Sequence, residues 1–342
     1  MIGGASANKF TVSGWTHSAT LDGGAGTDTI ISSNDTDFVL ADALLTRGDG
    51  ASFTLASIES AQLTGGASAN KFTVSGWSKT ATIDGGAGTN TIISSNDTDF
   101  VLADALLTRG DGASFTLTSI QTAQLTGGAS DNKFTVSGWS HSATLDGGAG
   151  SNTIISTNDA NFNLSDTSLT RSDGSSFTLT TIRNAQLTGG ASANTFHVGS
   201  YTGSATLTGL AGDDTYAFAG NWGTATVVEA VAQGNDKLDL SAVTVSLTVT
   251  IGANLNVTNG TSTVTSAGQT VEKVTGGTAA DTFNVTPSAT TAFTVDGAAG
   301  AGDVLNFHTT GLAVTQTATS LTATGMQPVN YQGFETVNQI TP

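Results

Sequence analysis

The sequence predicts an all-β protein whose chain winds into a right-handed parallel β-helix or β-solenoid. Three observations predict this fold class: a repeat of 62 residues, a shorter rhythm of about twenty residues inside it, and a composition suited to strands and turns. The 342 residues include 43 glycines and 15 phenylalanines but only 3 prolines. Glycine, asparagine and aspartate recur between short apolar runs, and a helical pattern is nearly absent.

The long repeat consists of near-identical strings. GGASANKFTVSGW begins at Gly3 and again at Gly65, and close variants begin at Gly127 and Gly189. A weaker start, GGTAADTFNV, lies at Gly276. Such self-similarity at a fixed period is typical of architectures in which each unit buries its apolar face against its neighbours.

The repeat starts predict the domain organisation. We expect three near-identical repeats over residues 3–188, a divergent fourth repeat with longer coils over 189–275, and a divergent fifth repeat over 276–342. No linker separates them, so we expect one continuous solenoid. The fourth repeat contains a threonine-rich insertion over 221–273, which we expect to form a longer coil or a side hairpin and where a binding function would be sought.

The shorter rhythm gives the coils. Phe10, Ile30, Phe53 and Phe72 lead successive apolar runs, which predicts coils of about twenty residues and three coils per 62-residue repeat. We therefore expect Phe10 and Phe72 to lie in one column, and the stretch from Leu40 to Leu45 to form a bulging corner. The residues expected to point inward are Phe10, Val12, Leu21, Ile30, Phe38, Leu40, Phe53, Leu55 and Leu63, with Thr11, Thr20, Thr29 and Thr54 outward.

Composition excludes several classes of protein. The absence of cysteine excludes disulfide scaffolds and thiolate metal sites. Ten basic against 27 acidic residues give a net charge of −17, which argues against nucleic acid as a partner. No apolar run approaches the length of about 18 residues that a membrane span needs, so we expect no membrane insertion.

One polar position recurs in every repeat. It is asparagine in the first four repeats and Asp281 in the fifth, and the four asparagines are Asn8, Asn70, Asn132 and Asn194. A ligand site is one interpretation. A structural turn ladder, or an Asx turn that closes the bend, is the interpretation we favour, because the position recurs while the neighbouring residues vary.

The glycine-rich turns contain a motif that resembles that of a known family. LDGGAGTDTI, from Leu21 to Ile30, contains the G-G-x-G-x-D pattern, and LTGLAGDDTYAF at Leu207 is a degenerate version. The chain resembles the repeat arrays of giant secreted or cell-surface bacterial proteins and is distantly similar to RTX (haemolysin-type calcium-binding) β-roll repeats. The resemblance implies an extracellular or cell-surface location and a role as stalk, adhesin or matrix element.

The same resemblance raises the question of calcium. RTX sites need the motif in tandem, whereas each repeat here has one copy, and Asp28 is replaced by Asn90 and Asn152 in the next two repeats. We therefore expect no cofactor, with calcium as the weaker alternative. The candidate calcium ligands are Asp22, Asp28, Asp213, Asp214 and Asp303.

We expect no enzyme. His17 becomes Lys79 in the next repeat, and Glu59 becomes Gln121, so no acid–base group recurs. The nucleophile-elbow, zinc-protease and phosphate-loop motifs are absent. A polysaccharide lyase on the same architecture is the enzymatic alternative.

Several partners and binding roles remain open. The first is a neighbouring repeat of the same or an identical chain: the chain is expected to be a fragment of a longer array or, alternatively, to stack end to end into a filament. Another is a surface glycan, on which Trp15, Trp77 and Trp139 could stack, although the interpretation we favour is that they cap the apolar interior at a corner. A third is ice, on outward threonine columns, although Thr11 is followed by Ser13 and Thr54 by Ala56, so the array is irregular in the first repeat.

Overall fold

The computed structural model describes residues 1–230, 233–309 and 311–341, and within them it contains 37 strands and no helix. Consequently no helix in these ranges has the length and apolarity needed to cross a bilayer. The chain divides into two compact units, a first unit of residues 1–155 and 174–182 and a second of residues 156–173 and 183–342.

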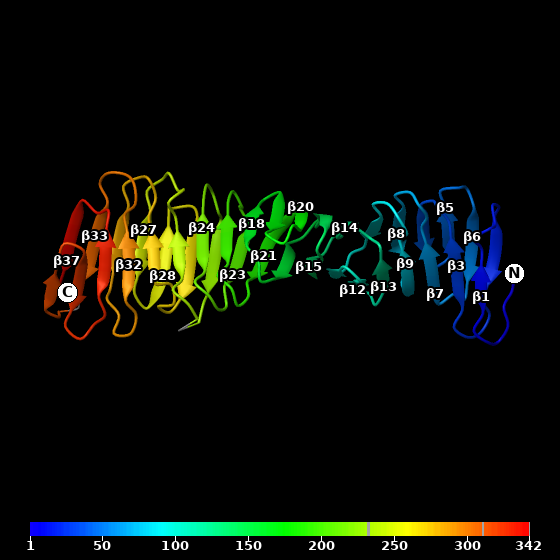
Figure 1. Ribbon diagram of the computed structural model, residues 1–342, viewed down its shortest axis with the longest axis horizontal. Coiled ribbons are helices and arrows are strands. Elements are labelled where there is room, and N and C mark those ends of the chain that lie inside the picture. The colour runs from blue at the N-terminus through cyan, green and yellow to red at the C-terminus, as the bar shows by residue number, and fades with distance from the viewer. Residues whose placement is uncertain (231–232, 310, 342) are drawn as a thin grey trace. The chain divides into compact units, whose positions relative to one another are not determined.

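The first unit has two sheets, here called A and B, and the chain passes from one to the other and back. Sheet A runs, in spatial order, β2 (Ala19–Asp22), β6 (Ser52–Ala56), β5 (Leu44–Arg47), β4 (Phe38–Ala41), β8 (Lys71–Gly76), β10 (Thr91–Ser95), β14 (Thr122–Thr126), β16 (Ser142–Asp146) and β20 (Ser176–Thr180). Sheet B runs β1 (Lys9–Thr11), β3 (Thr29–Ser33), β7 (Ser60–Thr64), β9 (Thr80–Asp84), β13 (Ser114–Thr118), β12 (Leu106–Arg109), β11 (Phe100–Ala103), β15 (Lys133–Gly138) and β17 (Asn152–Thr157). Strands that are distant in sequence, such as β3, β7 and β9, thereby lie side by side (Figure 1).

The second unit has two sheets of the same kind, again called A and B. Its sheet A contains β19 (Ser168–Arg171), β18 (Phe162–Ser165), β22 (Thr195–Val198), β24 (Thr215–Phe218), β26 (Lys237–Asp239), β30 (Lys273–Thr275), β32 (Phe293–Asp296), β36 (Val329–Gln332), β35 (Ser320–Ala323) and β34 (Val314–Gln316). Its sheet B contains β21 (Ile182–Thr188), β23 (Ser204–Thr208), β25 (Thr224–Val228), β29 (Thr263–Ala267), β28 (Asn254–Thr258), β27 (Thr248–Ile251), β31 (Thr282–Val285), β33 (Val304–His308) and β37 (Thr336–Ile340).

Most neighbouring strands are parallel, because the chain returns to the same sheet after each full turn. Phe10 pairs with Ile30, and Ala61 pairs with Ala81, which gives turns of 20 residues. A turn therefore contributes one strand to each of two sheets, and the predicted β-solenoid of about 20-residue coils is confirmed.

The number of coils per repeat differs from the prediction. The first repeat contributes seven strands, β1 to β7, and an odd number of strands places the start of the next repeat in the opposite sheet. Phe10 thus lies in sheet B, whereas Phe72 lies in sheet A, where it pairs with Phe38 and Ile92. The expected column of Phe10 and Phe72 is wrong: the first repeat makes two and a half turns instead of three.

Three of the seven strands form an antiparallel meander within a single sheet, so the repeat makes only five half-turns. The stretch from Leu40 to Leu45, expected to be a bulging corner, forms the hairpin between β4 and β5, which pairs Ala41 with Leu44. The next repeat builds the same meander from β11, β12 and β13 in the other sheet. The insertion over 221–273 likewise contains a meander, formed by β27, β28 and β29.

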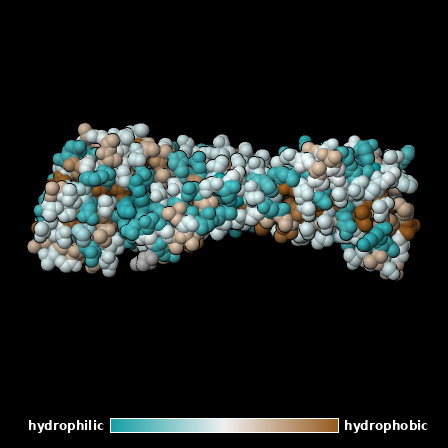
Figure 2. Space-filling view, viewed as in Figure 1, coloured by the Kyte–Doolittle hydropathy of each residue, from teal (hydrophilic) through white to brown (hydrophobic). Residues whose placement is uncertain are grey.

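The predicted interior is buried. Each of the nine residues expected to point inward is at most 7% exposed. Phenylalanines stack between coils, with ring centroids 5.3 Å apart for Phe38 and Phe72. Thr29 is the exception among the outward threonines: it is buried, and its hydroxyl lies 2.7 Å from that of Ser60. The visible surface is mostly hydrophilic or intermediate, with hydrophobic residues in scattered spots (Figure 2).

A buried arginine ends the middle strand of each of the first two meanders, and sequence reasoning missed it. Arg109 is 5% exposed. Its guanidinium donates to the backbone oxygens of Val74 (3.0 Å) and Trp77 (2.5 Å), to Ser94 Oγ (3.2 Å) and Asn96 Oδ1 (2.9 Å), and pairs with Asp111 at 2.9 Å. Arg47 makes the equivalent set in the first repeat. The arginine therefore joins the meander to two other coils.

Replacing this arginine should destabilise the first unit. Arg109→Ala leaves several buried acceptors without a donor, so we expect the free energy of unfolding to fall by about 3 kcal/mol. Urea denaturation followed by circular dichroism measures the change. Lys133→Ala, which removes an exposed cation on β15, is the control and should have little effect. Equal midpoints for the two variants would contradict the assigned role.

Candidate metal centre

Three carboxylates of the second unit converge at one corner of the solenoid. Asp214 directly precedes β24, Asp236 directly precedes β26, and Glu229 directly follows β25. Because β24 and β26 pair in parallel, with Thr215 opposite Lys237, the two aspartates occupy successive coils. One oxygen from each of the three carboxylates lies within 4.8 Å of the others.

Backbone amides hold one oxygen of each aspartate in place. Asp214 Oδ1 accepts from the amide of Asn194 at 2.6 Å, and Asp236 Oδ1 accepts from the amide of Asp214 at 2.9 Å. The ladder continues to Glu272, whose Oε2 accepts from the amide of Asp236 at 2.8 Å. Each side chain thus caps the coil before it, and its orientation is set by the stacking of the coils.

The second oxygen of Asp214 has no such partner. Asp214 is fully buried, and neither its Oδ2 nor Glu229 Oε2 has a hydrogen-bond partner. A buried carboxylate oxygen without a donor is costly unless it binds a proton or a cation. The unpartnered oxygen of Asp214 is therefore the strongest sign of a ligand at this corner.

Gly209 leaves the space in which these groups meet. A Cβ at this position would collide with Glu229 Oε1, Asp214 Oδ2 and the hydroxyl of Tyr216. The Tyr216 hydroxyl donates to Glu229 Oε1, which orients the glutamate from the interior side. The corner therefore combines a fixed carboxylate, an oriented glutamate and a missing side chain.

Burial and mutual repulsion raise the pKa values of the three acids. Burial, followed by the charge of Asp236, raises the pKa of Asp214 to about 6. Burial also raises the pKa of Glu229 to about 7, with Asp236 and Asp214 adding to the shift, and burial raises the pKa of Asp236. The charge of Lys273 partly offsets the rise in the pKa of Asp236, and Lys237 forms an ion pair with Asp239 at 2.8 Å. No ion pair in the described ranges includes Asp214, Glu229 or Asp236.

The donor set fits a hard divalent cation. All the ligand atoms are oxygens, which suits Ca²⁺ or Mg²⁺ and not the softer metals that prefer nitrogen and sulfur. Three carboxylates in an irregular corner match the flexible geometry of Ca²⁺ better than the strict octahedron of Mg²⁺. Asp214, Glu229 and Asp236 would hold the ion.

Of the five predicted calcium ligands, only Asp214 lies in this cluster. Asp213 is exposed and accepts from the amide of Asn235 at 2.9 Å, and Asp22 accepts from the amide of Gly24 at 3.1 Å. These two side chains serve the turns in which they lie.

Asp28 and Asp303 are each buried with one unpartnered oxygen, outside any three-carboxylate cluster found in the described ranges. The second repeat shows what the fold supplies there. Asn90, equivalent to Asp28, donates its amide to the backbone oxygens of Ala87 and Ser119 at 3.0 and 3.1 Å. An ionised aspartate cannot donate, so Asp28 faces the same kind of turn without the hydrogen bonds that Asn90 makes.

The recurrent asparagines begin short ladders within each repeat. Asn70 Oδ1 accepts from the backbone amide of Gly66 at 2.8 Å, and the backbone amide of Asn70 donates to Asn90 Oδ1 at 2.8 Å. The same turn-closing bond is made by Asn8, Asn132 and Asn194, and by Asp281 in the fifth repeat. The structure therefore links each asparagine to its own turn and to the next coil.

Sequence reasoning missed Glu229 and Asp236. A signal existed: Glu229 follows TATVV where Gly209 follows SATLT one coil earlier, and Thr208 pairs with Val228. Glu229 thus replaces a turn glycine one coil from Asp214, and this replacement is the signal in the sequence. The alignment of Asp236 with Asp214 was concealed, because the coil before Asp236 is two residues longer than the coil before Asp214.

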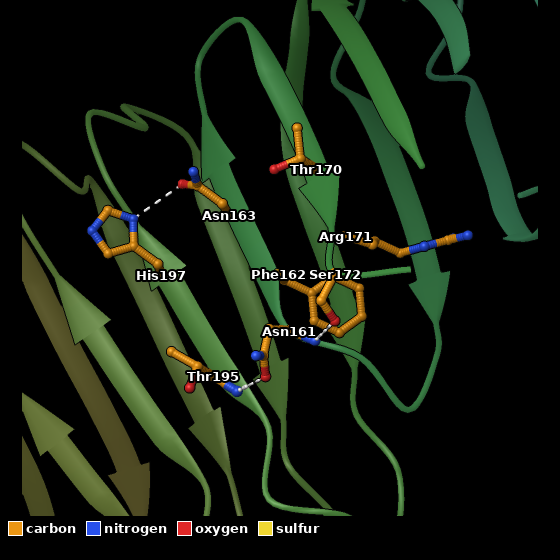
Figure 3. A pocket seen from close by; sticks show the side chains of 8 residues that line it. All are labelled: Asn161, Phe162, Asn163, Thr170, Arg171, Ser172, Thr195 and His197. Atoms are coloured by element: carbon orange, nitrogen blue, oxygen red, sulfur yellow. Dashed lines mark hydrogen bonds between the residues drawn. The ribbon is translucent and has the colours of Figure 1, made fainter. Parts of the chain in front are cut away.

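A second feature of the same unit is an open hollow of about 520 Å³ over β18, β19 and β22 (Figure 3). Its polar side chains bond to one another: His197 Nδ1 lies 3.0 Å from Asn163 Oδ1, and Asn161 Oδ1 accepts from the amide of Thr195 at 2.8 Å. In the earlier repeats a valine and a threonine, such as Val39 and Thr73, form the pair equivalent to Asn163 and His197. We assign no chemistry to this surface pair.

Comparisons with known proteins identify no family. No family model matches the chain, and no curated protein matches it. Among solved structures the chain is similar to the extracellular lipase LipA from Serratia marcescens, with 15% sequence identity and a TM-score of 0.20. The match covers 78% of this chain and 37% of the lipase chain, so the chain spans well under half of that protein. A likeness this weak carries no argument about activity.

The raised pKa values predict a pH dependence. The folded pKa values of Asp214 and Glu229 lie above the ordinary values of 3.8 and 4.5. The folded state therefore binds these protons more tightly, and their contribution to stability is lost as pH rises from about 4 to about 7. Without divalent cations, the melting midpoint of the second unit should fall over this range. Asp214→Asn combined with Glu229→Gln should flatten the profile, and an unchanged profile in this variant would refute the assignment.

Proposed function

We propose that the chain is a non-catalytic structural segment of a large extracellular or cell-surface protein, acting as a stalk, adhesin or matrix element. The observation that carries this proposal is the stacking of near-identical repeats, in which each coil is held by the next through two sheets. Such a fold gains stability with each added coil. Its surface can also be extended, because every added coil continues the same core.

Surface character supports an extracellular role. The chain has a net charge of −17 spread over only 11% charged residues, and it has no cysteine that needs a reducing or oxidising compartment.

The hollow over β18 and β22 gives no support to catalysis, because its histidine faces an asparagine and not a nucleophile or an acid.

Localisation tests the proposal directly. An antibody raised against the purified chain should label intact cells of the source organism, and mild proteolysis of intact cells should remove the label. Labelling that requires permeabilised cells would refute the extracellular role. Incubation with polysaccharides and ester substrates should release no product, and turnover of any of them would refute the non-catalytic role.

We infer, as a second function, that the second unit binds Ca²⁺ at Asp214, Glu229 and Asp236. The fully buried Asp214 Oδ2 without a partner favours it. A cation there would neutralise the repulsion between the three acids and join the coils of β24, β25 and β26. The site would then stabilise the solenoid where its repeat is least regular.

Calcium should raise the melting midpoint of the second unit. A ligand at about 100 times its dissociation constant adds about 2.7 kcal/mol of stability. Calorimetry with Ca²⁺, with Mg²⁺ and with a chelator measures the shift, which should vanish in Asp214→Asn and persist in the control Asp42→Asn, an exposed turn aspartate of the first unit.

Terbium gives an independent readout. Tb³⁺ takes oxygen ligands as Ca²⁺ does, and the ring of Tyr216 beside Glu229 should sensitise its luminescence. We expect an emission signal that Ca²⁺ displaces and that Glu229→Gln reduces. Neither a calcium shift nor terbium emission would dismiss the metal site while leaving the structural role intact.

A further inference from the structure

The outward face of sheet B in the second unit carries an unusual array. Each of its nine strands contributes at least two outward residues, and strand pairing aligns two residues from every strand in two columns. The first column is Asn184, Ser204, Thr224, Thr263, Thr258, Thr248, Thr282, Val304 and Thr336. The second column is Gln186, Thr206, Thr226, Thr265, Asn256, Thr250, Asn284, Asn306 and Asn338.

The two columns are uncharged and repetitive. Ten of the 18 side chains are threonines, 17 carry a hydroxyl or an amide, and none is charged or aromatic. None of them is buried. Sheet A of the same unit differs: its outward positions include Lys237, Asp239 and Lys273. In a chain with a net charge of −17, two neutral columns across nine strands distinguish this face from the opposite one.

The polar groups of this face are held in fixed positions. Threonine is β-branched, so its χ1 angle is restricted and little entropy is lost when it binds. The asparagines form their own ladder: Asn306 donates to Asn284 Oδ1, and Asn338 donates to Asn306 Oδ1, both at 3.0 Å. Strand geometry sets the spacing at about 4.8 Å between strands and about 6.7 Å between the two columns.

We propose that this face binds ice. A crystal surface of ice is a two-dimensional lattice of water oxygens, and a two-dimensional lattice of hydroxyls, amides and methyl groups can order water in register with it. Charged side chains would keep their own hydration shells and break the match, and the two columns contain none. A soluble sugar would instead need aromatic rings or acids around one local site, and neither occurs in the two columns.

The register of the structure supplies what the first repeat lacks. The threonines there do not continue in T-x-T runs, whereas β23, β25 and β29 pair Ser204, Thr224 and Thr263 in one column and Thr206, Thr226 and Thr265 in the other. Eight of the nine strands of the binding face, all but β21, thus belong to the divergent fourth and fifth repeats.

Recrystallisation inhibition and thermal hysteresis of the purified chain test the proposal. The chain should restrain ice growth, and a fluorescently labelled sample should coat a growing ice crystal. Thr226→Tyr and Thr250→Tyr each place a ring on one column, and each should lower the activity by about tenfold or more because shape match is lost. The control, Thr294→Tyr, alters an exposed threonine on sheet A and should leave activity unchanged.

Circular dichroism and melting curves establish that each variant is folded before its activity is compared. An inactive wild-type chain would overturn the proposal, as would equal losses in the sheet A and sheet B variants. Sedimentation with crystalline cellulose and chitin is the parallel assay. Binding to either polysaccharide that Thr226→Tyr abolishes, without activity on ice, would overturn the proposal in favour of a glycan-binding face.

Discussion

Parallel pairing of each strand with the strand one turn later is the interaction on which the rest of the structure depends. It forces residues about 20 positions apart into contact and gives every coil the same two sides. The meander keeps three consecutive strands in one sheet, so the seven strands of the first repeat make five half-turns. Successive repeats consequently present the same residues on opposite sheets, and near-identical sequence covers both faces of the first unit.

The corners show how one fold accommodates either amides or acids. In the second repeat Asn90 Oδ1 accepts from the backbone amide of Asn70, and the backbone amide of Asn90 donates to Gln121 Oε1. Its side-chain amide donates to Ala87, so the side chain of Asn90 is satisfied within the protein. In the first repeat Asp28 and Glu59 occupy the equivalent positions. A carboxylate offers no N–H donor, so the hydrogen bonds that the side-chain amide of Asn90 donates have no counterpart there. The fourth repeat extends this pattern to Asp214, Glu229 and Asp236, which is why a cation is expected there and not in the second repeat.

Sequence reasoning predicted the architecture better than the site. Period-2 alternation identified the buried residues, because successive side chains of a strand point to opposite faces of the sheet. The column of Phe10 and Phe72 was wrong, because the meander of β4, β5 and β6 uses residues without crossing to the other sheet, which residue spacing alone does not reveal. Arg109 was missed because its buried acceptors come from coils that no local pattern brings together. Asp214 was found through its motif, whereas Glu229 became visible only when β23 and β25 were aligned in register.

The central claim is that a repeat makes two and a half turns, and disulfide cross-linking tests it most directly, since the chain contains no cysteine. Val39 and Thr73 are paired on the outer face of β4 and β8, within the distance that a disulfide bridges. Thr11 and Thr73 occupy equivalent positions of two repeats but lie in opposite sheets. Under mild oxidation the double variant Val39→Cys with Thr73→Cys should cross-link readily, and Thr11→Cys with Thr73→Cys should not. The reverse result would contradict the account.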